Sequence, residues 1–332
     1  MSYICSCKQI LFMLEKFRTE TASRSVRGTI RGSILRHVMR HGNFMMTEIA
    51  EATGYSLTTI AKYVAELRSD GMIAELERVN LHTKGRKAIL YGVNPDSYYF
   101  LGVDMKTFEL NIALINFIGE VVRIERHTDF RFENTHDVLD ELCNRVQRFI
   151  DTLEGIDPEK IAGANLNLSG RVDSCTGTSA SVFNFEELHD TPLADFLKEK
   201  LGLKIFIEND TKAMAYGEYM SGKNKQYENL LYVNIGWGLG LGIVIDGKVY
   251  YGKDGYSGEF GHVHMYNNNI LCHCGKKGCI ETEVSGRAIH RKLIERINNG
   301  ETEVALVTVE PMLQGITKAS SSSDSFLSAV RR

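Results

Sequence analysis

The residues best suited to chemistry lie in one short stretch, Gly258 to Glu281, with the sequence GEFGHVHMYNNNILCHCGKKGCIE. It contains His262, Cys272, Cys274 and Cys279. Three thiols and an imidazole form a ligand set that tetrahedral Zn²⁺ takes in closed structural sites. We therefore expect a structural zinc ion at these four residues.

Two glycines and two further histidines bear on this site. Gly275 and Gly278 lie between the second and third thiols, where glycine allows the tight turn that brings the sulfurs together. His264 and His273 are close in sequence, so the fourth ligand stays open between them and His262. Free thiols in a glycine-rich loop are the alternative interpretation.

Composition restricts the class of protein. The chain has 332 residues, 43% hydrophobic and 24% charged, which suits two or three globular domains. No apolar run reaches the length of about 18 residues that a membrane span needs, and the N-terminal segment lacks a secretory cleavage site. Seven cysteines, an odd number with three clustered, fit a metal site and the reducing cytoplasm. We expect a cytoplasmic protein.

Charge is distributed unevenly along the chain. Residues 1–95 hold 14 Lys and Arg against 8 Asp and Glu, whereas residues 96–332 are net acidic by 9 charges. A basic segment joined to an acidic body favours a nucleic-acid-binding module. The polar, proline-containing sequence Asn94-Pro95-Asp96 marks a boundary. We therefore predict one domain at 1–95 and another at 96–332.

The basic segment has the pattern of a winged helix-turn-helix. We predict helices over 34–41, over 47–52 with Thr47 as cap, and over 57–67 with Ser56 as cap and Leu57, Ile60, Val64 and Leu67 on its apolar face. Strands at 72–76 and 88–93 would flank a basic wing. The second helix of such a motif enters the DNA major groove. The residues we expect to face DNA are Ser56, Thr58, Thr59, Lys62 and Tyr63 on the helix, and Lys84 and Arg86 on the wing. A small helical bundle that mediates dimerisation or docking is the alternative.

The acidic body alternates strands with helices, which predicts an α/β fold. Three strands at 99–104, 109–116 and 120–126 are followed by a helix at 135–153 and a strand at 161–168. A further helix at 193–201 leads into a strand at 204–208, and the last periodic helix covers 285–297.

From Leu101 to about Ile294 the chain resembles the ROK family, which groups sugar-responsive repressors with sugar kinases. The matching motifs, in order, are LGVD, IENDTKAMAYGE, NIGWGLGLGIVIDGKVYYG, GEFGH and CHCGKKGCIE. The winged helix-turn-helix ending in GRKA resembles the repressor branch. The resemblance implies an actin-like (ribonuclease H-like), two-lobed ATPase and sugar-kinase fold, which we expect to be incomplete at its C-terminus.

The resemblance also implies sugar-binding residues. Asn209 and Asp210 match the sugar-binding pair, and Asp210 takes the place of the kinase base. Glu259, His262 and Glu281 match positions that contact sugar hydroxyls, which suits the bidentate hydrogen bonding of carboxylates. For Asn209 and Asp210 alone, a strand-to-helix turn is the alternative interpretation.

One departure from the family separates regulator from kinase. The kinases carry DxGGT after the first strand. Here Asp104 matches the aspartate of that motif, and Lys106 and Thr107 stand in the places of its two glycines. The glycines at 236, 238, 240 and 242 remain, and we interpret them as a structural hairpin. We expect no catalytic residue, because phosphoryl transfer depends on positioning ATP and Mg²⁺.

We therefore predict a transcriptional regulator, most simply a repressor of carbohydrate uptake and catabolism genes. Its partners would be operator DNA, a sugar or sugar-phosphate effector and a second copy of the chain in a homodimer or higher oligomer, with no membrane. The alternatives are an ATP-dependent hexose or amino-sugar kinase of the same family and a protein that only mediates assembly.

Overall fold

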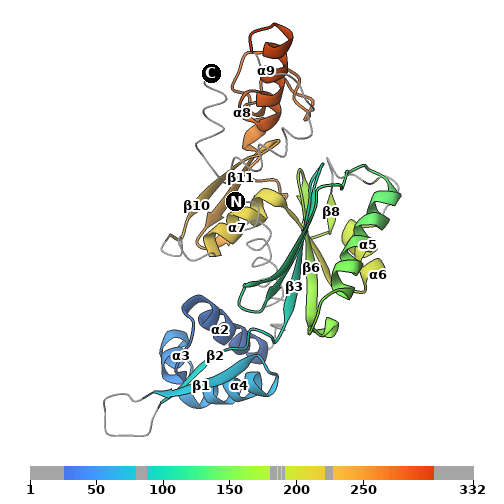
Figure 1. Cartoon of the computed structure of the whole chain (residues 1–332). Coiled ribbons are helices and arrows are strands. Elements are labelled where there is room, and N and C mark those ends of the chain that lie inside the picture. Colours follow the sequence, from blue (N-terminus) through green and yellow to red (C-terminus); the bar gives the residue numbers. More distant parts are fainter. Residues whose placement is uncertain are drawn as a thin grey trace. The chain divides into compact units, whose positions relative to one another are not determined.

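Three helices and a hairpin fold together at the start of the described chain. The computed structural model describes residues 26–79, 88–179, 185, 188, 191–220 and 227–302. Helices α2 (Val26–His41), α3 (Met46–Thr53) and α4 (Leu57–Ser69) pack with the antiparallel strands β1 (Ile73–Val79) and β2 (Ala88–Val93), as Figure 1 shows. This arrangement confirms the predicted winged helix-turn-helix. The wing residues Lys84 and Arg86 lie outside the described residues.

The caps of the two short helices differ from each other. Ser56 caps α4 as predicted, because its side chain accepts a hydrogen bond from the backbone N–H of Thr59. The prediction that Thr47 caps α3 is wrong. The helix begins one residue earlier, and the N–H of Met45 donates to the Glu48 carboxylate at 2.7 Å, which satisfies that end of the helix.

A five-stranded sheet follows, with the strand order β5-β4-β3-β6-β9. Its strands are β3 (Tyr99–Met105), β4 (Leu110–Asn116), β5 (Val121–His127), β6 (Ile161–Leu168) and β9 (Ile205–Asn209). The first three form an antiparallel meander, and β6 pairs parallel with β3. Helices α5 (His136–Asp151) and α6 (Leu193–Leu201) cover one face, where the strands and helices share a hydrophobic core (Figure 1). The short elements η1 (Pro158–Lys160), β7 (Val172–Asp173) and β8 (Thr178–Ser179) complete this part.

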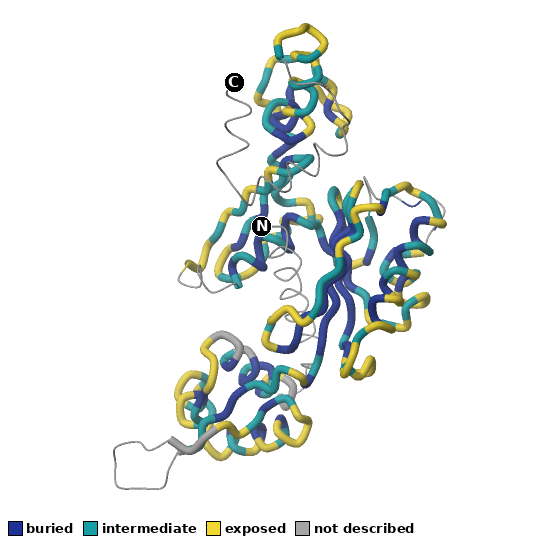
Figure 2. The backbone as a smooth tube through the Cα atoms, in the orientation of Figure 1, coloured by how far each residue is buried: buried dark blue, intermediate teal, exposed yellow. Residues whose placement is uncertain are grey.

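The opposite face of the sheet shares a core with the winged helix. Phe100, Ile115 and Phe117 belong to the same buried cluster as Ile60 and other residues of the three helices. Figure 2 shows the buried stretches of the sheet and of these helices in dark blue. A backbone hydrogen bond also connects the sheet with the segment that follows the winged helix, because the N–H of Phe117 donates to the carbonyl of Pro95 at 2.9 Å. The winged helix is therefore packed on the sheet as well as joined to it by the chain.

The chain separates into two compact units between Glu208 and Asn209. In the second unit, β10 (Leu230–Ile235), β11 (Leu239–Ile245) and β12 (Lys248–Val249) form an antiparallel sheet, against which α7 (Asp210–Met220) packs. The remaining elements are η3 (Phe260–His262), α8 (Glu281–Val284) and α9 (Gly286–Asn298). Within the described ranges, every helix is too short or too polar to cross a membrane.

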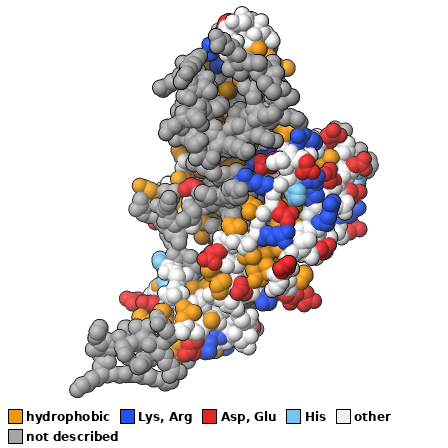
Figure 3. All heavy atoms as spheres, in the orientation of Figure 1, with side chains coloured by type: hydrophobic (Ala, Val, Ile, Leu, Met, Phe, Trp, Pro, Cys, Tyr) orange, Lys and Arg blue, Asp and Glu red, His pale blue; other side chains and the backbone are white. Residues whose placement is uncertain are grey.

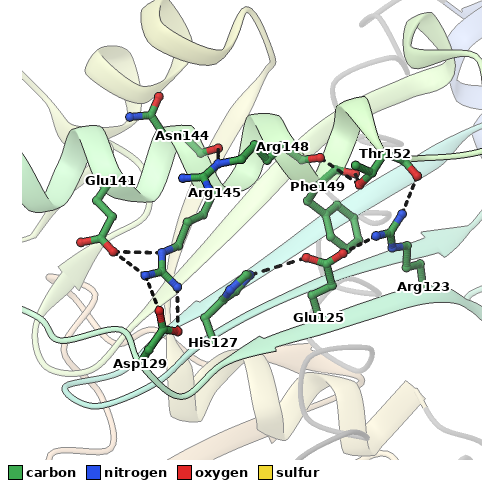
Figure 4. A network of polar contacts seen from close by, with 10 residues as sticks. All are labelled: Arg123, Glu125, His127, Asp129, Glu141, Asn144, Arg145, Arg148, Phe149 and Thr152. Atoms are coloured by element: carbon green, nitrogen blue, oxygen red, sulfur yellow. Dashed lines mark hydrogen bonds and ion pairs between the residues drawn. The ribbon is translucent and has the colours of Figure 1, made fainter.

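An ion-pair network holds α5 to the end of β5. Arg145 donates two hydrogen bonds to the Asp129 carboxylate, each 2.9 Å long, and also contacts Glu141, as Figure 4 shows. Acidic and basic side chains are interspersed over this part of the surface (Figure 3). The hydrogen bonds from Arg145 lower the pKa of Asp129 from 3.8 to about 2.

We predict a small, pH-dependent loss of stability in Asp129→Asn. A lowered pKa in the folded protein stabilises it above pH 3.8, and that contribution is lost as the pH falls toward 2. Because the Asp129 side chain is 72% exposed, we expect the loss to be less than about 1 kcal/mol at pH 7. Unfolding of both proteins by urea across this pH range measures it. A difference that is as large at pH 2 as at pH 7 would contradict this assignment.

Candidate metal centre and ligand site

Four side chains of the second unit converge in the arrangement that a tetrahedral ion requires. The ligand atoms of His262, Cys272, Cys274 and Cys279 all lie within 4.8 Å of one another. The Sγ of Cys272 is 3.5 Å from Nδ1 of His262, and the sulfurs of Cys274 and Cys279 are 3.6 Å apart. Zn–S bonds of about 2.3 Å and Zn–N bonds of about 2.0 Å place tetrahedral ligands about 3.5–3.8 Å apart. These residues therefore fit zinc.

Backbone turns bring the thiols together. The N–H of Gly275 donates to the carbonyl of Cys272, and the N–H of Cys272 donates to Lys276. Gly275 and Gly278 have φ angles of 84° and 75°, as the expected tight turns require. At Gly278 a side chain would also meet the carbonyl oxygen of Tyr266 at 2.1 Å.

The other two histidines have different partners. His264 Nδ1 lies 3.0 Å from the carbonyl oxygen of Lys277. His264 belongs neither to the cluster with the three cysteines nor to a second group of possible metal ligands, which consists of His262, His273 and Glu281. His273 Nδ1 lies 2.8 Å from the Glu281 carboxylate. The geometry therefore favours His262 as the fourth ligand.

Burial disfavours free thiolates at two of the three cysteines. It raises the pKa of Cys272 to about 12 and also raises the pKa of Cys279. Burial acts in the same direction on Cys274, but hydrogen bonds from the Lys276 backbone and from the other two thiols lower its pKa. A bound cation would supply the charge that all three need to act as thiolate ligands.

Glu281 joins the cysteine loop to the glycine-rich strand. The residue is 5% exposed, Oε2 accepts a hydrogen bond of 2.9 Å from the N–H of Leu239, and Oε1 faces His273. Burial opposes its ionisation, but the hydrogen bonds from His273 and Leu239 lower its pKa. Sequence reasoning proposed only sugar contact here and missed this bridging role. The glycines at 238 and 261 were the available signal, because a Cβ at either would lie 3.0 or 3.3 Å from Glu281.

Asn209 and Asp210 form the transition from β9 into α7. Oδ1 of Asn209 accepts from the N–H of Lys212 at 3.0 Å, and Oδ1 of Asp210 accepts from the N–H of Thr211 at 2.6 Å. These bonds cap the helix and also fix the direction of both side chains. The turn interpretation and the ligand interpretation are therefore compatible at this pair.

The Gly258–His262 segment lies against β11. The carbonyl of Gly258 accepts from the N–H of Leu241, and Nε2 of His262 is 3.8 Å from the Glu259 carboxylate. His262 thus directs Nδ1 toward the cysteines and Nε2 toward Glu259. One imidazole connects the metal-ligand cluster with the predicted sugar-contacting carboxylate.

A buried lysine near this segment was missed by sequence reasoning. Lys212 is 4% exposed, and its ammonium donates to the carbonyl of Gly255 at 2.6 Å. The Tyr251 ring lies 5.9 Å away. Lys212 therefore ties the first turn of α7 to the loop that precedes Gly258. Nothing in the local sequence marks it, because the contact spans 43 residues.

Close packing explains two glycines of β11. A Cβ at Gly240 would lie 2.5 Å from Oγ1 of Thr211, and one at Gly242 would lie 2.3 Å from Cβ of Ala215. Both contacts are with α7, so these glycines let the helix approach the strand. This supports the structural interpretation of the glycine-rich turn.

The turn after β3 is filled by a side chain. The Lys106 ammonium lies 3.2 Å from the Asp104 carboxylate and 3.6 Å from Glu109. A phosphate at such a turn would need close approach to backbone N–H groups, which glycine permits and a lysine side chain obstructs. This geometry disfavours phosphate binding as kinases use it.

The helix that we expect to read DNA differs from the prediction at three positions, Leu57, Thr59 and Tyr63. Thr58 and Lys62 are exposed as expected, while Thr59 is half-buried and bonds Ser56 at 2.8 Å. The prediction that Tyr63 faces outward is wrong, because it is 9% exposed and packs in the core with Ile60, Val64 and Leu67. Leu57, predicted in the apolar face, is instead 50% exposed.

Known proteins resemble this chain in both parts. Residues 100–328 match the model of the ROK family, and residues 29–74 match a winged helix-turn-helix DNA-binding model. The chain is 27% identical over 261 residues to the xylose repressor of Bacillus subtilis (strain 168), across 78% of this chain and 66% of that protein's length. It is 26% identical over 300 residues to the DNA-binding transcriptional dual regulator NagC of Escherichia coli (strain K12), across 90% and 72%. A solved ROK family transcriptional regulator, a homologue of the E. coli MLC protein, aligns with a TM-score of 0.67 and 28% identity over 84% of this chain and 69% of that one.

Proposed function

Because this chain belongs to the ROK family and carries a winged helix-turn-helix, we propose that it is a sugar-responsive transcriptional repressor that acts in the cytoplasm. The observation that carries the proposal is the capped helix α4, which exposes Thr58 and Lys62 from a winged helix packed on the ROK sheet. The names of the two relatives, a xylose repressor and a DNA-binding transcriptional dual regulator, support it. Its targets would be genes of carbohydrate uptake and catabolism, and its domains would divide near residue 95.

We propose that the effector is a sugar or sugar phosphate bound by the second unit. Asn209, Asp210 and Glu259 would bond vicinal hydroxyls, since amides and carboxylates form paired hydrogen bonds with such groups. Glu281 would act both as a hydroxyl contact and as the bridge to Leu239. A structural zinc ion held by His262, Cys272, Cys274 and Cys279 would supply only cross-linking of the loop, because protein ligands fill all four positions.

We propose that binding is coupled to DNA release through a homodimer or higher oligomer. Paired helices must reach half-sites one helical turn or a multiple apart, so a small change in their spacing weakens operator binding. The shared core of the winged helix and the sheet supports this, because movement of the sheet would carry α4 with it. The effector must then favour one spacing over the other.

A mobility-shift titration tests the proposal. We expect the wild type to bind specific duplexes from the DNA around its own gene, and one sugar of a panel to weaken that binding at least tenfold. Asp210→Asn should bind the same duplexes and lose the response to sugar, because its carboxylate supplies a hydroxyl contact. No specific DNA binding with or without sugars would overturn the proposal.

A sugar kinase is the second candidate. Asp210 favours it, because by resemblance to the family this residue, the first of α7, matches the position of the kinase base. The Lys106 side chain beside Asp104 opposes it. An ADP-release assay over hexoses and amino sugars separates the two. We expect no release above background.

A further inference from the structure

Helix α4 has two faces of different chemistry. Its buried side is formed by Ile60, Tyr63, Val64 and Leu67. The exposed side begins with Leu57 and Thr58 and continues through Lys62 and Ala65, with Ala61 half-buried between them. Between Leu57 and Ala65, the exposed residues of α4 other than Lys62 carry methyl groups and the hydroxyl of Thr58.

The charged residues near the end of the helix have protein partners. Arg68 lies 3.4 Å from Glu75 and also stacks over the Tyr91 ring. Glu66 lies 3.5 Å from Arg31. Arginine or lysine reads guanine, and asparagine or glutamine reads adenine, by paired hydrogen bonds. Near the N-terminal end of α4, the exposed side offers only Lys62 for such a contact.

Leu57 occupies the position from which base contacts are made. Leu57 is the first residue of α4, the second helix of the helix-turn-helix motif, and it follows the Ser56 cap directly. The residue is 50% exposed. In helix-turn-helix proteins the N-terminal residues of this helix contact base edges in the major groove. Thymine alone among the bases presents a methyl group there, and it is read by apolar contact.

We propose that Leu57, with Thr58 and Ala61 beside it, reads thymine C5-methyl groups in the operator. The inference rests on the proposed DNA binding and adds to it the chemistry of base recognition. A protein partner fits this surface less well, because the hydroxyl of Thr58 is adjacent to Leu57 in the chain and the exposed ammonium of Lys62 lies one turn after Thr58. The buried core of a protein interface is depleted of charged residues.

Replacing thymine by deoxyuridine tests the inference, because it removes only the methyl group. Duplexes are first selected from a randomised pool with the wild-type protein, and each thymine of the selected site is then replaced in turn. Burial of one methyl group corresponds to about a fourfold change in affinity. We expect such a loss at two or more positions for the wild type, and no loss at the same positions for Leu57→Ala.

A matched control separates recognition from general damage. Leu76→Ala shortens a leucine of β1 with nearly the same exposure, 48%, and should keep the full deoxyuridine effect. Deoxyuridine tolerated everywhere, or an equal loss in Leu57→Ala, would refute the inference while leaving DNA binding intact. A change in oligomeric state in Leu57→Ala would likewise refute it and assign the residue to a protein contact. Failure of the wild type to select any duplex would refute the proposed function itself, and the inference with it.

Discussion

Cys274→Ser is expected to purify without zinc, whereas the wild type is expected to carry about one ion per chain. The four ligand atoms lie within 4.8 Å of one another, and two pairs already have tetrahedral spacing, so removal of one sulfur leaves an incomplete site. Structural zinc binds with about 10–16 kcal/mol, which equals or exceeds the whole stability of a typical domain. We therefore expect the loop around the cysteines to lose its fixed structure. Elemental analysis and thermal unfolding of the two proteins measure both effects.

The control is Cys175→Ser, which removes an exposed thiol outside the cluster. It should retain the metal and the melting temperature of the wild type. Absence of zinc from freshly purified wild type would contradict the assignment, as would full retention in Cys274→Ser.

Loss of the ion should also displace the predicted sugar-binding residues. His262 belongs to the metal cluster and faces Glu259 with its other nitrogen. Glu281 follows Cys279 by two residues and bonds the N–H of Leu239. Disorder of the cysteine loop would therefore move two predicted sugar contacts, and we expect Cys274→Ser to lose its sugar response while retaining DNA binding.

Local patterns predicted most elements of the fold. Strand β6 and helix α6 have the predicted bounds, and the other elements that were predicted for the body differ by one or two residues. Apolar periodicity and caps act over a few residues, so they can be recognised without knowledge of the rest of the chain. The exchange of Leu57 and Tyr63 shows the limit of such patterns. The helical period allows either residue to lie on the apolar face. Packing against the surrounding core determines that Tyr63 is the one that is buried.

The parts of the site that could not be predicted depend on contacts between distant residues. The bond from Lys212 to Gly255 spans 43 residues, and that from Leu239 to Glu281 spans 42. The four candidate metal ligands lie within 18 residues of one another, and thiols and imidazoles at such short spacings are a recognisable sequence pattern. Proximity in sequence, more than chemical type, determined what could be predicted here.

Gly258→Ala is expected to cause the largest loss of stability of any single methyl addition in the second unit. Gly258 has φ of 83°, and a Cβ there would lie 1.8 Å from the carbonyl oxygen of Leu241. The left-handed backbone alone costs a non-glycine residue about 1–2 kcal/mol. The clash is with the backbone of β11 at Leu241, which is paired with Val233 of β10 and donates its N–H to the carbonyl of Gly258, so it has little freedom to move. We therefore expect a total loss of more than about 3 kcal/mol.

Gly252→Ala provides a control with the same backbone conformation and free space. Its φ is 71°, and the nearest atom to an added Cβ is 3.4 Å away, in ordinary contact. Gly252→Ala should then lose only the stability that the left-handed backbone conformation costs an alanine, about 1 kcal/mol. Urea unfolding gives both values, and sugar titration should show a lost response only in Gly258→Ala, because Glu259 follows directly. Equal stability losses in the two variants would mean that the backbone angle, and not the approach of β11, requires glycine at 258.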